Sequence, residues 1–481
     1  MSRSGNRAMT AETRGGSGVR ALIADSMTGA GVRALIADSM TEMEKTGTYL
    51  SAEVNAVLDK HDSLDPRDKA FYKTVMDGSC ERRITIDYIL DRYSKTPVHK
   101  MKPMIRAILR MSVYQLMWMD SVPDSAVCNE AVKIAGARGF SGLKGYVNGV
   151  LRTVSREKNN IRYPSKEDEP VKHLSVVYSC PEWIVKLLFD TYGDIRTESI
   201  LKALLDSRYI SVRMRTDEKG ARALEDKWKK AGVSVSPNPH IPYGRLLKDT
   251  GAVQKLAGFE EGDFTVQDTG SMMVAELSLI RPGDTVMDLC AAPGGKSLHA
   301  ADMLCKQGHV YAYDISESRC GRITENIRRM GMEDVITVSV HDSTELIPEM
   351  EGKADVVIAD VPCSGLGVIG HKSDIRYRIT PDDIDSLVSV QRQIIDTAVR
   401  YVRPGGRLVY STCTMNHAEN DDQAAYIMVN YGFSDITAKA LAESAVNSPK
   451  DSIRVPGLQI LPDEWCSDGF YICVLERTSD D

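Results

Sequence analysis

The sequence contains no long apolar run in its 481 residues. Because a helix that spans a bilayer needs about 20 consecutive, mostly apolar residues, we do not expect a membrane protein. The first 18 residues are polar and rich in Gly, Ser and Arg. They have no apolar stretch of the kind that a secretory signal requires, so we expect no such signal.

Cysteine is present, but no spacing typical of a metal site accompanies it. The ten cysteines are scattered along the chain and include no C-x-x-C pair; the closest two are Cys466 and Cys473. This argues against a zinc site, and we expect no metal. Free thiols in a chain without a signal indicate a reducing compartment, so the predicted location is the cytoplasm.

The motifs of two common nucleotide-binding folds are also missing. The glycine-rich turn at 288–296 is not a G-x-G-x-x-G motif, and Lys296 with Ser297 lacks the spacing of a P-loop. Neither a dinucleotide nor ATP is therefore favoured as a ligand.

The net charge is acidic but unevenly distributed. A formal charge of −7 argues at first sight against a nucleic-acid protein. Between Glu81 and Pro164, however, 15 Lys and Arg stand against seven Asp and Glu. A basic segment in an acidic chain is a candidate phosphate-binding surface. The alternative is a helical domain with ordinary solvated lysines and arginines.

The length predicts two or three domains. Segment 18–28 recurs as 31–41, and we expect a disordered, duplicated N-terminal segment over residues 1–31. Apolar residues at helical spacing then predict an all-α domain over 32–164. Mixed signals over 165–262 predict a linker and a small α+β, RRM-like domain.

Strands alternate with helices from residue 263 to 481. This alternation predicts a mostly parallel sheet covered on both faces, that is, an α/β domain. The predicted strands are Thr285–Leu289, His309–Tyr313, Val335–Val340, Val356–Ala359, Arg407–Tyr410 and Phe470–Leu475.

Candidate ligand-binding residues follow the first three of these strands. In an open parallel sheet, ligands bind beyond the carboxyl ends of the strands. The turn at 288–296 lets backbone approach a ligand closely, or it is simply a structural turn. Asp314 comes about 20 residues later, where a carboxylate can accept both hydroxyls of a ribose. Asp342 can hold an adenine amino group; the alternative for either acid is a helix N-cap.

Two cysteines follow the next two strands. Asp360 and Cys363 end the fourth strand, and Cys413 ends the fifth. If these strands are neighbours, both thiols face one cleft. Buried cysteine often acts as a small hydrophobe, but each of these lies beside a polar Ser or Thr. Thiol chemistry on a pyrimidine needs one sulfur to attack, and a second group can help release the product.

The chain resembles the RsmB (Sun) family of bacterial 16S rRNA 5-cytosine methyltransferases over roughly residues 32 to 477. In the catalytic half, residues 288–296 are similar to the family's cofactor motif, and residues 360–367 and 411–414 to its fourth and sixth motifs. Residues 461–462 with 468–470 are similar to its last strand. In the N-terminal half, the segments similar to the family's NusB-like RNA-binding domain are 64–68, 122–124, 129–132 and 146–152.

The resemblance implies a Rossmann-like, S-adenosylmethionine-dependent catalytic domain that methylates cytosine C5 in 16S rRNA through a covalent cysteine–C6 adduct. It makes Cys413 the nucleophile and Cys363 the product-release thiol, while Asp360 is placed to hold the cytosine. The implied cofactor residues are Cys290, Ala291, Ala292, Pro293, Gly294, Gly295, Lys296, Asp314, Asp342 and Asp360. The predicted RNA contacts are Lys372, Arg376 and Arg378, although a solvated loop explains the last two equally well.

The expected partner is 16S rRNA or a small-subunit assembly intermediate, and the protein itself is expected to be a monomer. Segment 371–374 departs from the family, whose members often carry a more basic stretch with a Pro there. In DNA cytosine-5 methyltransferases the Pro-Cys thiol attacks, so only the resemblance assigns the order of the two sulfurs. The alternatives are a DNA cytosine methyltransferase, a non-catalytic RNA-binding factor, and an enzyme of this type acting on tRNA, against which rRNA is favoured by analogy alone.

Overall fold

The computed structural model describes residues 31–206, 209–449 and 456–478. The chain divides into two compact units after Ser165. The predicted disordered segment, 1–31, lies outside the described residues except for Gly31, which begins helix α2. Among the helices in these ranges, none has the length and apolar character needed to cross a bilayer.

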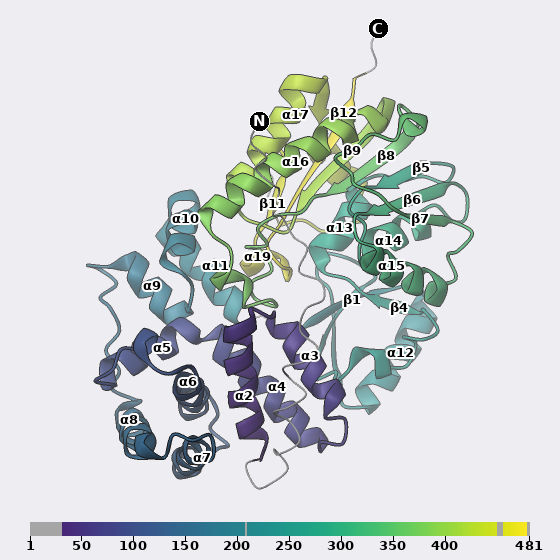
Figure 1. Cartoon of the computed structure of the whole chain (residues 1–481). Helices are drawn as coiled ribbons and strands as arrows, with labels where there is room; N and C mark the ends of the chain where they lie inside the picture. The colour runs from purple at the N-terminus through teal and green to yellow at the C-terminus, as the bar shows by residue number, and fades with distance from the viewer. Residues whose placement is uncertain (1–30, 207–208, 450–455, 479–481) are drawn as a thin grey trace, which may run out of the picture. The chain divides into compact units, whose positions relative to one another are not determined.

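The first unit is all-helical, as predicted (Figure 1). Its helix α6 packs against α2, α4, α5, α7 and α8, and the apolar residues Ile105, Leu109, Val113 and Leu116 of α6 are buried. The Asp65-Pro66 step begins α4, because the Asp65 side chain accepts a hydrogen bond from Arg67 N. The helices are α2 (Gly31–Thr46), α3 (Leu50–Lys60), α4 (Pro66–Glu81), α5 (Arg83–Tyr93), α6 (Pro103–Trp118), α7 (Asp124–Ala137) and α8 (Lys144–Glu157).

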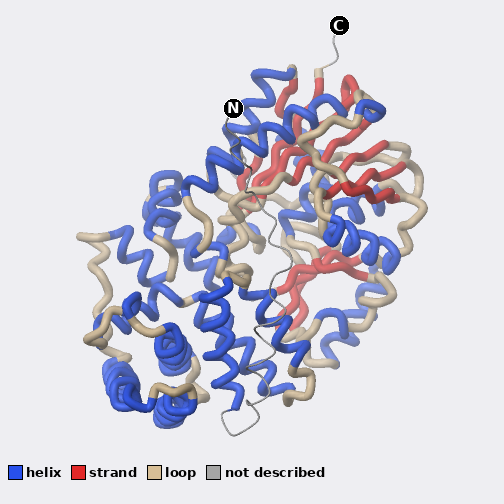
Figure 2. Tube along the Cα trace, in the orientation of Figure 1, coloured by secondary structure: helices blue, strands red, loops and turns tan. Residues whose placement is uncertain are grey.

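The second unit contains two separate sheets (Figure 2). The larger has the strand order β10-β12-β9-β8-β5-β6-β7, and β11 pairs with β12. Neighbours from β9 to β7 are parallel, whereas β10, β11 and β12 pair antiparallel. Its strands are β5 (Thr285–Asp288), β6 (His309–Asp314), β7 (Ile336–Val340), β8 (Ala354–Asp360), β9 (Val402–Thr412), β10 (Phe433–Asp435), β11 (Leu458–Ile460) and β12 (Phe470–Arg477).

Helices cover both faces of this sheet, as the alternating pattern predicts. Alternate strand residues such as Val356 and Ile358 pack with one group of helices, and Val357 and Ala359 pack with the other. The first group is α13 (Thr269–Leu277), α14 (Gly295–Met303), α15 (Glu317–Met330) and α18 (Thr437–Glu443). The second is α16 (Pro381–Tyr401) and α17 (Asp421–Tyr431); a short helix, α19 (Pro462–Trp465), follows β11.

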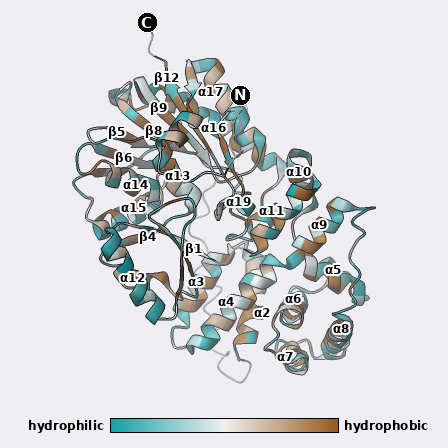
Figure 3. Ribbon diagram, turned by 180° about the vertical axis from the view of Figure 1, so that it is seen from behind, coloured by the Kyte–Doolittle hydropathy of each residue, from teal (hydrophilic) through white to brown (hydrophobic). Residues whose placement is uncertain are grey.

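The smaller sheet is antiparallel, with the order β2-β3-β1-β4. Its elements are β1 (Ile210–Met214), α12 (Glu218–Lys230), β2 (Ser234–Pro237), β3 (Gly244–Lys248) and β4 (Phe264–Val266). Because β4 pairs with β1, the sheet extends past the boundary expected at residue 262. Helix α12 is mostly hydrophilic (Figure 3) and buries only Ala221, Leu224 and Trp228.

Two further contacts organise the second unit. Arg213 of β1 and Arg215, which follows β1 directly, both pair with Asp302 at the end of α14, at 2.6 and 2.8 Å. The three helices α9 (Pro170–Tyr178), α10 (Glu182–Tyr192) and α11 (Asp194–Asp206) form a core with Leu366 and Met415. These helices therefore pack against the loops that follow β8 and β9, and not only among themselves.

Candidate active site

The two cysteines predicted to share a cleft lie side by side. Strands β8 and β9 are parallel neighbours, and Asp360 is paired with Ser411 at their carboxyl ends. Cys363 and Cys413 follow within three residues, so both leave the sheet at the same edge. Their sulfur atoms are 3.2 Å apart, and the backbone N–H of Cys413 points at the Cys363 sulfur at 3.3 Å.

The surroundings make the two thiols unequal. The hydrogen bond from Cys363, helped by Lys296 and Lys372, lowers the pKa of Cys413 in spite of burial and nearby Asp360. The same hydrogen bond, burial and the charge of Glu419 raise the pKa of Cys363 well above its ordinary value. Since the thiolate is the nucleophilic form of cysteine, the direction of these two pKa shifts favours Cys413 over Cys363 as the thiolate.

Asp360 is held by partners from two elements. Its carboxylate accepts from the Lys296 ammonium at 2.7 Å and from the Ser411 hydroxyl at 2.8 Å. Lys296 stands in the first turn of α14, and Ser411 ends β9. A carboxylate with both oxygens engaged is held in one orientation, close enough to Cys413 to affect its pKa.

The glycine turn at 288–296 contains a backbone conformation that favours glycine. Gly294 has φ +102°, and a side chain there would press on Ile323 at 3.1 Å. Ala291 N donates to Tyr313 O, and Ala292 N donates to Asp314. Two of the predicted cofactor residues, Ala291 and Ala292, therefore lie against the end of β6.

The acids after β6 and β7 already have local partners. Asp314 is 2% exposed and accepts from Ala292 N and Ser316 N, each at 3.2 Å. Asp342 accepts from the backbone and the hydroxyl of Thr344. Both thus form local turns, and neither is the helix N-cap considered as the alternative: Ser316 caps α15, and Ile347 precedes the 3-10 helix Pro348–Met350. A carboxylate oxygen has more than one lone pair, so these contacts leave capacity for a ligand.

The three predicted RNA contacts behave differently from one another. Lys372 is exposed, and Arg378 is partly exposed beside Asp374 at 3.5 Å. Arg376 is 2% exposed, and its guanidinium donates to Ser179 O and to a second backbone carbonyl, Ile369 O. The prediction for Arg376 needs correction: burial makes it a link between α9 and the loop after β8, where it cannot meet a phosphate.

Comparison with known proteins follows the same division of the chain. A family model described as 16S rRNA methyltransferase RsmB/F matches residues 276–476, and a NusB family model matches residues 31–156. The chain is 33% identical to the "Probable ribosomal RNA small subunit methyltransferase B" of Bacillus subtilis, over 91% of this chain and 96% of that one. It is 31% identical to the protein of the same name from Synechocystis, covering 91% and 97%.

The chain belongs to the RsmB/F family of 16S rRNA methyltransferases. Among solved structures, it is similar to PH0851, with a TM-score of 0.75 and 25% identity over 93% of this chain and 98% of that one. It also shares the fold of NSun6 from Pyrococcus horikoshii, solved with SFG, with a TM-score of 0.53 and 22% identity over 62% and 99%.

Sequence reasoning missed one buried group in this RsmB/F-family site. Glu419 is fully buried and joins the loops that carry the two cysteines. Gln391 of α16 and Asn416 also donate to it. The available signal was an acid placed between a strand and a helix, six residues after Cys413; that position alone does not reveal its partners.

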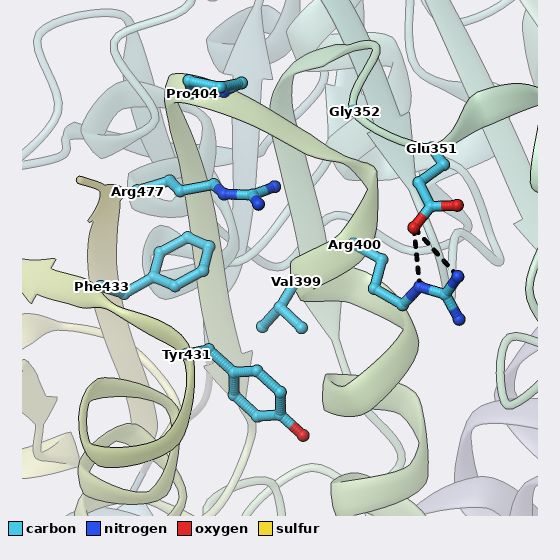
Figure 4. Close-up of a pocket in the computed structure, with 8 residues that line it drawn as sticks. All are labelled: Glu351, Gly352, Val399, Arg400, Pro404, Tyr431, Phe433 and Arg477. Atoms are coloured by element: carbon cyan, nitrogen blue, oxygen red, sulfur yellow. Dashed lines mark hydrogen bonds and ion pairs between the residues drawn. The ribbon is translucent and has the colours of Figure 1, made fainter. Parts of the chain in front are cut away.

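A cavity of about 290 Å³ lies at the other end of the same strands. Figure 4 shows its lining, which includes Phe433, Tyr431 and the ion pair between Arg400 and Glu351. Residues at the amino ends of β8 and β9 contribute to it, whereas the thiols follow the carboxyl ends. The cavity is therefore separate from the RsmB/F thiol site.

Proposed function

We propose that this chain methylates C5 of a cytosine in 16S rRNA, with S-adenosylmethionine as methyl donor and Cys413 as nucleophile. Membership of the RsmB/F family supports the rRNA substrate. The observation that carries the chemistry is the thiol pair, with sulfurs 3.2 Å apart and the pKa of only one of them lowered. We further propose that residues 32–164 bind RNA and that the protein acts as a monomer in the cytoplasm on rRNA or an assembly intermediate.

The proposed cofactor supplies an electrophilic methyl group when bound. Residues Cys290–Lys296 fit it because the Gly294 backbone leaves room where a side chain would not, and because N–H groups gather at the start of α14. Asp314 and Asp342 would hold its ribose and adenine. This is the carboxyl edge at which ligands bind in open α/β sheets.

Cytosine C5 is a weak nucleophile, and the protein must activate it. The Cys413 thiolate attacks C6, which breaks the ring conjugation and moves electron density to C5. Asp360, fixed by Lys296, holds the cytosine edge while charge develops in the ring. After C5 is methylated, a base takes up the C5 proton and the Cys413 sulfur leaves by elimination, with Cys363 as the thiol that assists this release. The base must be outside its stack, which costs least in an unpaired loop.

The roles of the two sulfurs are tested by paired variants. We expect Cys413→Ala to abolish methylation of 16S rRNA and Cys363→Ala to accumulate a covalent protein–RNA adduct on a denaturing gel. Turnover retained in Cys413→Ala, or an adduct that accumulates only in that variant, would reverse the assignment. Side-by-side assays with 16S rRNA, tRNA and DNA, followed by mapping of 5-methylcytosine, test the substrate.

A further inference from the structure

Glu419 is a buried acid at the centre of the thiol-bearing loops. It ends the short 3-10 helix η6 (His417–Glu419) between β9 and α17, and it is 0% exposed. A carboxylate in such a place is costly unless hydrogen bonds compensate for the lost water. Its function must therefore be sought in the groups that it binds.

Four donors converge on this carboxylate. Ser364 donates through its backbone N–H at 2.8 Å and its hydroxyl at 2.5 Å. Gln391 donates at 3.1 Å and Asn416 at 3.2 Å. Three of the four donors are N–H groups, which an acceptor-only carboxylate satisfies and a neutral amide does not. Charge-assisted hydrogen bonds of this kind are stronger than neutral ones.

The donors flank both cysteines. Ser364 follows Cys363 directly, and Asn416 lies three residues after Cys413. Gln391 also donates to Pro362 O at 2.9 Å, on the other side of Cys363. The Ser364 hydroxyl is also 2.8 Å from that of Thr414, beside the second cysteine.

The neighbouring residue, Asn420, fixes the second loop from within. Its side chain donates to Thr414 O at 3.1 Å and accepts from the Thr412 hydroxyl at 2.5 Å. Cys413 is thus held on both sides, and Glu419 connects this rigid segment to the Cys363 loop.

We propose that Glu419 is a positioning residue that sets the separation of the two active-site sulfurs by tying the Cys363 loop to the Cys413 loop. The functional importance of this role rests on the proposed thiol chemistry. The hydrogen bonds that connect the two loops do not depend on that chemistry. The negative charge of Glu419 adds to the hydrogen bond and burial that keep the pKa of Cys363 high. It therefore helps to keep Cys363 a proton donor toward its partner.

Disulfide formation measures the distance between the sulfurs without any methylation assay. Diamide oxidises a pair of thiols to a disulfide and is itself reduced to the hydrazine, taking up both protons and both electrons. Because a disulfide forms only between well-placed cysteines, the rate of the Cys363–Cys413 bond, followed by peptide mass spectrometry, reports their approach. We expect Glu419→Gln to slow it about tenfold, because the amide places N–H groups against the Ser364 donors.

The kinetic expectation separates positioning from general damage. We expect Glu419→Gln to lower kcat roughly a hundredfold, since small misplacements of reacting groups cost that much, with KM for S-adenosylmethionine nearly unchanged. Glu419→Asp should recover part of both losses. Glu443→Gln, an exposed acid of α18, is the matched control and should behave as wild type.

The outcomes discriminate clearly. Wild-type rates of disulfide formation and of turnover in Glu419→Gln would overturn the proposal. If that variant does not fold, Ser364→Ala removes the hydroxyl contact to Glu419 and the contact to Thr414 but keeps the backbone N–H, at lower structural cost. Wild-type rates in Ser364→Ala would then overturn the proposal. Slowed disulfide formation together with full turnover in Cys413→Ala would refute the proposed function and leave the positioning role intact.

Discussion

The Lys296 ammonium lies 2.7 Å from the carboxylate of Asp360. The two residues come from the helix after β5 and from the end of β8, which are neighbouring strands. The pair thus joins the turn assigned to the cofactor to the loop that carries Cys363. It also places a cation close enough to lower the pKa of Cys413. Among the groups that lower this pKa, Lys296 comes second to the hydrogen bond from Cys363.

Removing that cation should weaken the nucleophile. In Lys296→Met we expect the pKa of Cys413 to rise, because the thiolate loses a stabilising charge, and methylation to fall roughly 10²–10³-fold, as when one preorganised electrostatic contact is removed. The pH dependence of iodoacetamide labelling at Cys413, read by mass spectrometry, measures the first effect. Lys353→Met, at an exposed position before β8, is the control. An unchanged labelling profile would contradict this account.

Asp288 should make stability depend on pH. Burial raises the pKa of its carboxyl to about 6, although the Ser297 hydroxyl donates to it. A raised pKa means that the folded state keeps its proton longer, so this contribution to stability is full below the unfolded pKa, near 3.9, and is lost as pH rises through about 6. From about pH 5 upward, the loss corresponds to one pKa unit, or about 1.4 kcal/mol.

The variant Asp288→Asn cannot titrate and should not show this loss. We therefore expect the unfolding free energy of Asp288→Asn, relative to wild type, to increase by about 1.4 kcal/mol between pH 5 and pH 7.5. Denaturant titrations of both proteins at the two pH values measure this difference. A difference that stays constant with pH, or that decreases, would be inconsistent with a raised pKa at Asp288.

Much of the catalytic fold was predictable because its pattern is local. Strands β5, β6 and β8 are short apolar runs followed by an acid, and each was predicted close to its observed limits. The proximity of the Cys363 and Cys413 thiols was predictable on the assumption that their strands, β8 and β9, are neighbours. The short strands of the small sheet were harder: β3 contains only Gly244–Lys248 and takes its identity from antiparallel pairing with β1 and β2.

Burial of charged groups was not predictable, since it depends on distant partners. Arg376 stands in a basic Arg-Tyr-Arg segment that suggests solvent or RNA, yet its partner Ser179 is almost 200 residues away. Glu419 likewise meets Ser364, 55 residues earlier. Spacing along the chain carries no information about either contact.

This difference between exposed and buried cations can be measured. Arg376→Met leaves two carbonyls without charged donors, and we expect a loss of about 3 kcal/mol of stability with little change in the salt dependence of RNA binding. Lys372→Ala should instead leave stability unchanged and reduce the slope of log K against log salt by about one. Filter binding over a range of salt concentrations, with thermal unfolding of the same samples, tests both. A reduced salt slope in Arg376→Met would restore its predicted role in RNA binding.

Backbone hydrogen bonds of Gly367 also hold the loop that carries Cys363 against the loop that carries Cys413. The N–H of Gly367 donates to Cys413 O at 3.0 Å, and its carbonyl accepts from Gly469 N at 3.0 Å. A methyl group on Gly367 would collide with the Gly469 carbonyl and come within 2.8 Å of Cys413 O. Backbone atoms cannot give way as a flexible side chain does, so even alanine must displace a loop.

We expect Gly367→Ala to lose about 1–3 kcal/mol of stability and to lower kcat, because the clash pushes the Cys413 loop away from the Cys363 loop. Gly321→Ala is the matched control: it lies exposed within α15 with open space around it and should gain about 0.5–1 kcal/mol from helix propensity. Thermal unfolding and methylation kinetics of both variants distinguish the two cases. Full activity in Gly367→Ala would show that the thiol site tolerates a shifted loop, against the rigid arrangement described for Cys363 and Cys413.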